Sequence, residues 1–384
     1  MTAVIAYFPS WKSGAFPVSH IPATMLTHVC YAFAGISPEG LCTLPDEHLD
    51  LKAETGFQVG TGEGALKGNF AAFRHLKAQH PHLKLLVSIG GWMGSQHFSQ
   101  MACTAESRAK FIESAISQFL LGCVADVFPE HAAGIFDGFD LDWEYPTQGG
   151  PDHNHHHPED AHHFTLLMQE FRAALDLLAQ DTGQTYELSV AVPAAPERLI
   201  HDFDLKGLSL VTDRIHLMTY DFTGEVQPLT TFHNNLFAVQ NAPLETQYSA
   251  HQTVQTAIHL GVPPEKLVLG IPFYGRMWKN LPSQNTGLFQ KHSGECFDGD
   301  LDYRLLVQEF LDSNQRFAPY YHLEAEVPYL FDAQQGTFIT FENPRSIKAK
   351  IRYMQLRNLQ GIMFWELTHD NGELLQTIHQ TLNP

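Results

Sequence analysis

The chain has 384 residues, of which 44% are apolar and 17% charged, and its formal net charge is −19. This composition is typical of a folded globular protein, and the length suits one large domain with an insertion or two domains. A chain this negative repels nucleic acid and anionic membranes, so neither is expected as a partner. No apolar run approaches the ~18 residues of a membrane span, and no signal peptide is recognised at the start.

The cysteines predict neither a disulfide framework nor a cysteine-based zinc site, because they are five in number and form no C-x-x-C pair. We expect most of them to be small buried apolar residues. A single bridge between Cys30 and Cys42 stays open as an alternative. The five are Cys30, Cys42, Cys103, Cys123 and Cys296.

Eight short apolar runs, rich in residues that favour strands, recur along the chain. Helical patterns lie between many of them, as at residues 108–121 and 161–179. Strands that alternate with helices predict parallel β-α units, and eight such units favour an α/β fold, the (β/α)8 TIM barrel, over an open doubly wound sheet. The predicted strands are 4–8, 28–34, 84–89, 136–144, 187–192, 214–220, 266–273 and 361–366.

The stretch between the seventh and eighth predicted strands is too long for one crossover helix. It contains turn-rich sequence, a helical pattern at 303–311 and β-like pieces near 329–331 and 337–341. Compact domains seldom hold so long a loop without structure of its own. We therefore predict a small α+β insertion domain at 277–340, with the barrel formed by residues 1–276 and 341–384.

Six histidines crowd between residues 153 and 163, directly after the fourth predicted strand. Clustered imidazoles can bind a transition metal. We interpret the stretch as a solvated loop that leads into a helix, because we see no suitably spaced Asp, Glu or Cys that completes a clear catalytic metal set. The six are His153, His155, His156, His157, His162 and His163.

The fourth predicted strand carries the strongest chemical signal. Side chains alternate faces along a strand, so Asp140, Asp142 and Glu144 share one face. The apolar residues between them, Trp143 included, share the other face and are expected to pack outward against helices. The acids then point into the barrel, and a bulge at the neighbouring glycine would add Asp137 to them.

Acids on one buried face raise one another's pKa, because like charges repel and burial removes water. Such an array can keep one acid protonated near neutral pH for general acid catalysis. Glu144 is the candidate because it comes last, at the C-terminal end of the strand, where barrel active sites open. An exposed edge strand and a divalent-metal site are the alternatives, and the second lacks histidine partners on the same strand.

Asp137-x-x-Asp140-x-Asp142-x-Glu144 resembles the signature of glycoside hydrolase family 18, the chitinases and their relatives. Four further segments resemble motifs of that family, in the family's order and from Tyr7 almost to the C-terminus. They are Ser88-Ile89-Gly90-Gly91, Met218-Thr219-Tyr220-Asp221, Gly270-Ile271-Pro272-Phe273-Tyr274-Gly275-Arg276 and Phe364-Trp365-Glu366. The resemblance implies a (β/α)8 barrel of the bacterial chitinase type with an α+β insertion.

The resemblance also implies a substrate-assisted reaction. Glu144 protonates the glycosidic oxygen and later acts as the base, with retention of configuration. The N-acetyl carbonyl of the sugar attacks the anomeric carbon and forms an oxazolinium ion, which Asp142 orients and stabilises. Tyr220 holds the acetamide oxygen, and Asp140 tunes Asp142 through shared protons.

Supporting roles are implied for further residues. Asp137 joins Asp140 in tuning Asp142 through shared protons, and Ser88 belongs to the hydrogen-bond network beneath the acids. Asp221 and Arg276 contact the sugar near the cleaved bond. Pyranose rings stack on aromatic side chains, and Trp365 is the expected platform. The other predicted substrate contacts are Met218, Tyr7, Phe33, Trp92, Tyr145 and Tyr274. Trp278 is a further candidate for the cleft, and core packing is the alternative for it.

We therefore predict a chitinase that hydrolyses β-1,4 bonds between N-acetylglucosamine units of chitin and chitooligosaccharides. No metal or cofactor is expected, and we predict a monomer whose partner is its substrate. The alternatives are a chitin-binding lectin, which usually lacks the terminal acid, and an enzyme that cleaves the chitobiose core of N-glycans, which resembles a more open barrel. Because the family is mostly exported, an extracellular location is expected.

Overall fold

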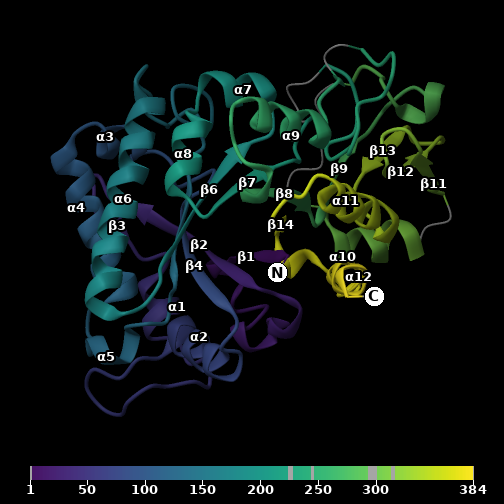
Figure 1. Cartoon of the computed structure of the whole chain (residues 1–384). Helices are drawn as coiled ribbons and strands as arrows, with labels where there is room; N and C mark the ends of the chain where they lie inside the picture. The colour runs from purple at the N-terminus through teal and green to yellow at the C-terminus, as the bar shows by residue number, and fades with distance from the viewer. Residues whose placement is uncertain (1, 224–227, 244–245, 293–300, 313–315, 384) are drawn as a thin grey trace. The chain divides into compact units, whose positions relative to one another are not determined.

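The structure is a computed structural model of the chain, and it describes residues 2–223, 228–243, 246–292, 301–312 and 316–383 (Figure 1). The chain divides into two compact units. The N-terminal unit comprises Ala3–Val192 and Arg198–His216, and the C-terminal unit comprises Met1–Thr2, Pro193–Glu197 and Leu217–Pro384. Within the described residues we find no helix with both the length and the apolar character needed to cross a membrane.

The N-terminal unit is built on a parallel sheet. Its strands are β1 (Ala3–Pro9), β2 (His28–Ile36), β4 (Lys84–Gly90), β5 (Gly138–Asp142), β6 (Glu187–Pro193) and the first residues of β7 (Arg214–Met218). β1 pairs with β2, β2 with β4, β4 with β5 and β5 with β6, all in parallel. A short β3 (Cys42–Thr43) pairs antiparallel with the end of β2.

Helices cover the apolar face of β5 in this unit. The longest, α6 (Asp160–Thr182), packs against α3 (Phe98–Ala102), α4 (Ala105–Ala115) and α8 (Leu205–Val211) (Figure 1). The Phe139 ring lies 4.9 Å from Phe171 of α6, and Trp143 stacks on Phe98 at 5.0 Å. The predicted outward packing of Trp143 is therefore confirmed. The unit also contains α1 (Glu47–Leu51), α2 (Gly68–Gln79), α5 (Pro129–Ala132) and a π-helical turn at Ile116–Leu120.

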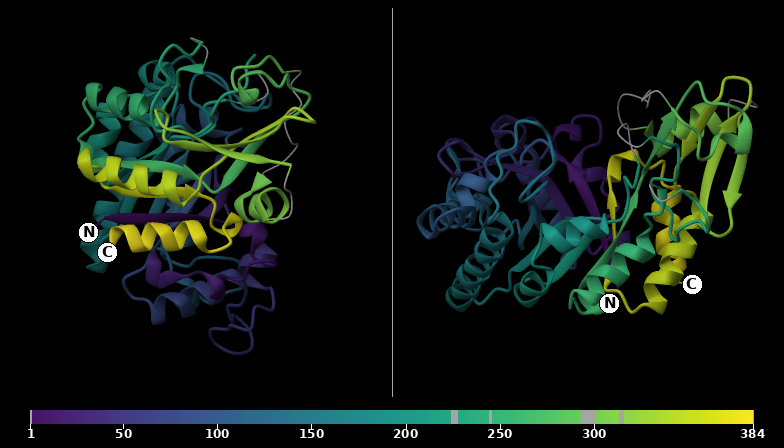
Figure 2. Two further views of the ribbon diagram at one scale, coloured as in Figure 1. Left: turned by 90° about the vertical axis from the view of Figure 1, so that its right-hand side faces the viewer. Right: turned by 90° about the horizontal axis from the view of Figure 1, so that it is seen from above.

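The C-terminal unit contains the last two parallel strands, β8 (Leu267–Pro272) and β14 (Gly361–Trp365), which pair with each other. The helix α11 (Pro344–Leu356) begins at Asn343, whose side chain accepts the Ser346 N–H at 3.0 Å in a capping box. It packs against α12 (Glu373–Leu382) (Figure 2). The remaining long helix of this unit is α9 (Ala250–His259), while α7 (Pro196–His201) contains a boundary between the units.

Eight parallel strands that alternate with helices give the chain an α/β, (β/α)8 barrel fold. The predicted fold class is confirmed, and each predicted strand is present with ends shifted by a few residues. The largest difference is at the fourth predicted strand, residues 136–144, because β5 spans only Gly138–Asp142. Glu144 therefore comes two residues after the strand rather than at its end.

The predicted insertion is a folded sheet with a core of its own. Five antiparallel strands follow the order β10-β9-β13-β12-β11, and a short α10 (Tyr303–Leu306) follows β10. The strands are β9 (Tyr274–Trp278), β10 (Leu301–Asp302), β11 (Ala318–His322), β12 (Val327–Asp332) and β13 (Thr337–Thr340). Trp278 and Phe338 belong to a buried apolar cluster on this sheet. The sheet begins three residues before the predicted boundary at residue 277, and that boundary stays a prediction.

The cysteines are not bridged in the part of the chain that the structure describes. Cys30 and Cys42 are buried free thiols, so the alternative of a bridge between them is wrong. Cys103 and Cys123 are exposed free thiols. Cys296 lies outside the described residues.

Candidate active site

The acids of β5 are buried on one face of the strand, as side-chain alternation predicts. Asp140 is fully buried and Asp142 is 4% exposed, while Glu144 is half-buried just beyond the strand. Among the described residues, no lysine or arginine forms an ion pair with Asp140 or Asp142. Buried carboxyl groups without a nearby cation are costly to ionise. They are therefore expected to accept hydrogen bonds from neutral groups and to share protons with one another.

Hydroxyl groups surround the Asp140 carboxylate. Ser88 on β4 and Tyr7 on β1 each donate to Oδ2 at 2.8 Å, and Ser189 on β6 donates to Oδ1 at 2.6 Å. Ser88, Asp140 and Ser189 lie in one register row across three strands, which makes their side chains point the same way. Three hydroxyl donors satisfy the hydrogen-bonding capacity of the Asp140 carboxyl group without adding a positive charge.

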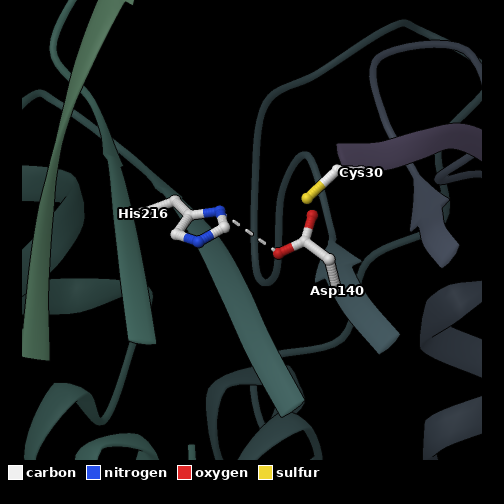
Figure 3. Close-up of side chains that lie close together, drawn as sticks. All are labelled: Cys30, Asp140 and His216. Carbon is white, nitrogen blue, oxygen red and sulfur yellow. Dashed lines mark ion pairs between the residues drawn. The ribbon is translucent and has the colours of Figure 1, made fainter. Parts of the chain in front are cut away.

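His216 and Cys30 complete the surroundings of Asp140, each from a different strand (Figure 3). His216 Nδ1 lies 2.9 Å from the Tyr7 hydroxyl oxygen and 3.4 Å from Asp140 Oδ1. Because the Tyr7 proton goes to Asp140, Nδ1 of His216 must be the donor in the contact with Tyr7. Burial lowers the pKa of His216 to about 4 and raises that of Cys30, so both groups are neutral at pH 7.

Asp142 has fewer hydrogen-bond partners than Asp140, although it is also buried. Burial raises its pKa well above the usual value, and the charges of Glu144 and Asp140 raise it further. Its Oδ1 atom is buried and has no hydrogen-bond partner among the described residues. A carboxyl group in this state can take a proton from a neighbour or accept a hydrogen bond from a bound molecule.

The backbone around Glu144 is held by two side chains. Ser95 accepts the Glu144 N–H at 2.9 Å, and Asn154 Nδ2 donates to the Glu144 carbonyl at 2.6 Å. Burial and the carboxylates of Glu144 and Asp142 raise the pKa of the adjacent Tyr145. Glu144 is thus fixed at its backbone while its side chain stays accessible.

The glycines of the segment Ser88-Ile89-Gly90-Gly91 allow close approach of the chain to this site. A Cβ at Gly90 would lie 2.2 Å from the Asp142 carbonyl oxygen, and one at Gly91 would lie 2.6 Å from the Phe33 ring. The Gly91 N–H donates to the same Asp142 carbonyl at 2.8 Å. Both glycines adopt positive φ, which other residues adopt only with strain.

The structure does not bring Asp137 to the other acids. Its carboxylate lies 2.7 Å from Lys77 Nζ and 3.4 Å from Lys84 Nζ, and it accepts the Leu85 N–H at 2.9 Å. Asp137 precedes β5, about 10 Å along the chain from Asp140 at the rise of a strand. The predicted bulge is therefore wrong for Asp137, because two lysines at the start of the strand pair with it.

The predicted aromatic contacts of this unit differ in exposure. Trp92 is 51% exposed and meets Tyr145 edge-on at 6.3 Å, and the Arg198 guanidinium lies 4.6 Å from the centre of the Tyr145 ring. Phe33 is half-buried and stacks with Trp11 at 6.3 Å. Tyr7 is only 3% exposed, so it serves the acid network rather than offering a stacking face.

The C-terminal unit holds a second group of predicted residues around Asp221. Arg276 Nε donates to Asp221 Oδ1 at 2.7 Å, and His233 Nδ1 lies 3.5 Å from the same oxygen. Asp221 is exposed, and Arg276 and His233 hold its pKa well below the usual range against the opposing effect of desolvation. Burial lowers the pKa of His233 to about 4. Asp221 is therefore ionised at any working pH.

Tyr220 lies beside this ion pair. Its hydroxyl donates to Met363 Sδ at 3.9 Å, and its ring meets Tyr274 edge-on at 6.2 Å. Tyr274 is buried and Trp365 half-buried. Met218, also half-buried, ends β7, two residues before Tyr220. Trp278 is fully buried in the core of the insertion, which supports core packing, the alternative left open for it.

Several residues of these two groups were not predicted from the sequence. Ser189 could have been found from strand parity combined with register, because it lies opposite Asp140. His216 lies on the same face of β7 as Met218, so strand alternation could have predicted it as well. Ser95, Asn154 and His233 come from loops or turns, where no periodicity points to a partner.

Comparison with known proteins identifies the family. The model of the family described as glycosyl hydrolases family 18 matches residues 3–370. The chain belongs to glycosyl hydrolase family 18. Its acid strand, the paired glycines at the end of β4 and the segment that carries Tyr220 are among the features that resemble that family.

Relatives of this family 18 hydrolase include bacterial and fungal proteins. It is 31% identical to Chitinase A1 of Niallia circulans, a match that covers 97% of this chain but only 57% of that protein. It is 30% identical to Chitinase 1 of Aphanocladium album, with 98% and 84% covered. The chain thus spans little more than half the length of the first of these relatives.

Solved structures of the family have the same fold. Chitinase ChiA74 from Bacillus thuringiensis has a TM-score of 0.88 at 31% identity, with 100% of this chain and 70% of that chain covered. A family 18 N-acetylglucosaminidase from Paenibacillus barengoltzii has a TM-score of 0.83 at 31% identity, with 99% and 100% covered. Solved structures of similar likeness therefore include both a chitinase and an N-acetylglucosaminidase.

Proposed function

We propose that this chain is a chitinase that hydrolyses β-1,4 bonds between N-acetylglucosamine units by substrate-assisted catalysis with retention of configuration. The observation that carries the proposal is Asp142, a buried carboxyl between two other acids whose Oδ1 has no partner among the described residues. A hydrogen-bond donor from the substrate would complete it. The acetamide N–H of N-acetylglucosamine is such a donor.

In the first step Glu144 donates its proton to the glycosidic oxygen while the bond from that oxygen to the anomeric carbon breaks. The acetamide carbonyl oxygen forms a new bond to the anomeric carbon, which gives an oxazolinium ion. Asp142 accepts the acetamide N–H and, as an anion, stabilises the positive charge that develops. The hydroxyl groups that donate to Asp140, together with the neutral His216, support this role. They let the acids exchange protons because no fixed cation is present.

In the second step a water molecule attacks the anomeric carbon from the face that the leaving group vacated. Glu144, now a carboxylate, takes a proton from that water, and the bond to the acetamide oxygen breaks. The product keeps the β configuration, since the anomeric carbon is inverted twice. The hydrogen bonds from the Glu144 backbone to Ser95 and Asn154 keep the residue in place for both proton transfers.

Roles for the residues of the C-terminal unit rest on the family motif. We assign Tyr220 to the acetamide oxygen, Asp221 and Arg276 to the sugar hydroxyls near the cleaved bond, and Trp365 to the face of the sugar ring. Met218 is assigned a packing contact with the substrate. The buried Tyr274 is assigned to support of Tyr220, with which its ring is in contact.

The proposal is tested with nitrophenyl-β-diacetylchitobioside on the wild type and on Glu144→Gln. We expect chromophore release to fall about 10³-fold or more, because the variant has no proton to donate. Glu130→Gln, an exposed glutamate on α5, is the matched control and should match the wild type. Binding of chitotetraose, measured by calorimetry, should persist in Glu144→Gln.

Equal release by both proteins would remove Glu144 from the reaction. Release by neither protein, with chitin binding intact, would favour the lectin alternative. The products of chitohexaose decide between a chitinase and an N-acetylglucosaminidase. A chitinase gives mainly dimers and longer fragments from the start, whereas monomers alone would favour the second.

A further inference from the structure

We propose that His157, Asp160 and His163 form a binding site for a divalent transition metal of the zinc class at the start of α6. The histidine-rich stretch between residues 153 and 163 was interpreted as a solvated loop, because no acid seemed to complete a ligand set. The structure supplies that acid. One potential ligand atom from each of the three residues lies within 4.8 Å of the other two.

The local backbone brings these residues together. The Asp160 N–H donates to the His157 carbonyl at 3.0 Å, and Asp160 Oδ2 accepts the His157 N–H at 2.6 Å. A tight turn through Pro158 therefore holds His157 beside Asp160. His163 follows one helical turn after Asp160, so both side chains lie on the same face of α6. The spacing His-x-x-Asp-x-x-His is the sequence signal of the site.

His163 points independently to a ligand. It is 8% exposed, and its Nδ1 atom is buried without a hydrogen-bond partner among the described residues. That nitrogen lies 3.7 Å from Asp160 Oδ1, and its ring stacks with His157 at 5.7 Å between centres. A buried imidazole nitrogen without a partner is costly, and a metal would satisfy it.

The distances and the chemistry of the donors suit zinc. Tetrahedral zinc with bonds of about 2.0–2.1 Å places neighbouring ligand atoms roughly 3.3 Å apart, close to the 3.7 Å of the His163–Asp160 pair. His157 is exposed, and its Nδ1 accepts the Glu159 N–H at 3.2 Å, which leaves Nε2 as the nitrogen available to a metal. Two imidazoles and one carboxylate favour zinc, copper or nickel over calcium and magnesium, which prefer oxygen ligands.

A second layer orients the carboxylate. Ser99 of α3 donates from Oγ to Asp160 Oδ1 at 3.1 Å, which fixes the oxygen that faces His163. Such contacts around the ligands typically change metal affinity 10–100-fold. A metal here would therefore link the loop, the start of α6 and α3 within the N-terminal unit.

The site adjoins the acid strand through the same loop. Asn154, three residues before His157, donates to the Glu144 carbonyl at 2.6 Å. A metal on His157 would restrain the loop that supplies this contact. The ion takes no part in the proposed reaction, so activity should survive a chelator, while thermal stability should change.

Calorimetric titration of the untagged full chain with zinc chloride tests the proposal. We expect one strong zinc ion per chain, weakened at least tenfold in both His157→Gln and His163→Gln. His153→Gln is the matched control, since it lies in the same stretch outside the trio, and it should bind as the wild type does. Ser99→Ala should weaken binding about tenfold. Zinc at a hundredfold excess over Kd should raise the melting temperature by about 3 °C.

The exposed His157→Gln keeps the test valid if substitution of the buried His163 disturbs folding. Zinc binding that is equal in the wild type, His157→Gln and His163→Gln would overturn the proposal. So would the absence of binding at 100 µM zinc, or binding of calcium with the same affinity. Tetrahedral absorption bands of bound cobalt, present in His153→Gln and lost in His157→Gln, would support it.

Discussion

Asp142 and Asp221 are the same residue type at the C-terminal ends of two barrel strands, but their surroundings are opposite. Asp142 lies among acids, hydroxyls and neutral groups, and its pKa is raised. Asp221 faces Arg276 and His233, and its pKa is held low. The first can gain or lose a proton as a reaction proceeds, whereas the second keeps its charge. The neighbours of each carboxyl group, more than its residue type, therefore determine its role.

The largest effect that tests this contrast is expected from Asp142→Asn. The amide cannot become an anion, so it stabilises the oxazolinium ion poorly, and kcat should fall about 10²–10³-fold. The melting temperature should stay the same or rise, because the change removes a buried like charge. Steady-state kinetics and calorimetry measure both. Unchanged kinetics would contradict substrate assistance.

A smaller effect is expected when Asp221 loses its cation. In Arg276→Gln, kcat/KM should fall about tenfold at pH 7, because the proposed contact of Arg276 with the sugar is lost. The pKa of Asp221 should also return toward the ordinary value near 3.9, so kcat/KM should decline further below pH 4.5. A pH–rate profile measures this additional acid limb. Arg304→Gln is the control, because Arg304 is exposed and pairs with Asp302 on the insertion. Parallel profiles for wild type and Arg276→Gln would show that Arg276 does not set the ionisation of Asp221.

A stability effect of a few kcal/mol is expected from two buried histidines, His216 beside Asp140 and His233 beside Asp221. His216 and His233 have pKa values lowered to about 4 in the fold, against 6.5 when unfolded. The unfolded chain therefore binds more protons between pH 6.5 and 4, and stability is full above pH 6.5 and lost as pH falls through that window. Each histidine contributes about 1.4 kcal/mol per pH unit near its middle.

Urea unfolding between pH 7 and pH 4.5 measures this loss. Replacing one of the pair, as in His216→Gln, should make the decline shallower. His201→Gln, a control outside both groups, should keep the wild-type slope. A stability that is independent of pH over this range would mean that neither histidine is buried as a neutral group.

The smallest catalytic effect is expected at Asp137, although it belongs to the family signature. Its partners are Lys77 and Lys84 rather than the acid array, so Asp137→Asn should change kcat less than threefold. Loss of its charged hydrogen bonds should lower stability by about 1–3 kcal/mol. Kinetics and urea unfolding separate the two readouts. A hundredfold loss of kcat in a folded variant would return Asp137 to the acid network.

Much of this fold could be predicted from the sequence because apolar strand runs and their alternation record which face is buried. The acid face of β5 and the outward packing of Trp143 follow from that alternation alone. Alternation does not give register, which is why Ser189 was missed although it lies opposite Asp140. Alternation also does not show how deeply a side chain is buried. Tyr7 was predicted to contact the substrate, but it is buried and donates to Asp140.

Loop residues were beyond prediction for a different reason. Asn154 and Ser95 act through turns whose conformation depends on tertiary contacts, and no period marks them. His157, Asp160 and His163 come together only through the turn before α6, and no sequence period marks the conformation of that turn. Asp137 was misplaced because its two lysine partners, Lys77 and Lys84, come from elements that the family signature does not include.

The most direct test of the contrast between the two aspartates is a carboxyl titration by nuclear magnetic resonance. The chain would be labelled with carbon-13 at the aspartate carboxyl carbon, and the two signals assigned by their loss in Asp142→Asn and Asp221→Asn. We predict that the Asp142 signal titrates clearly above the ordinary aspartate value of about 3.9, while the Asp221 signal does not titrate before acid unfolding. Titration of both signals near pH 4 would contradict the account.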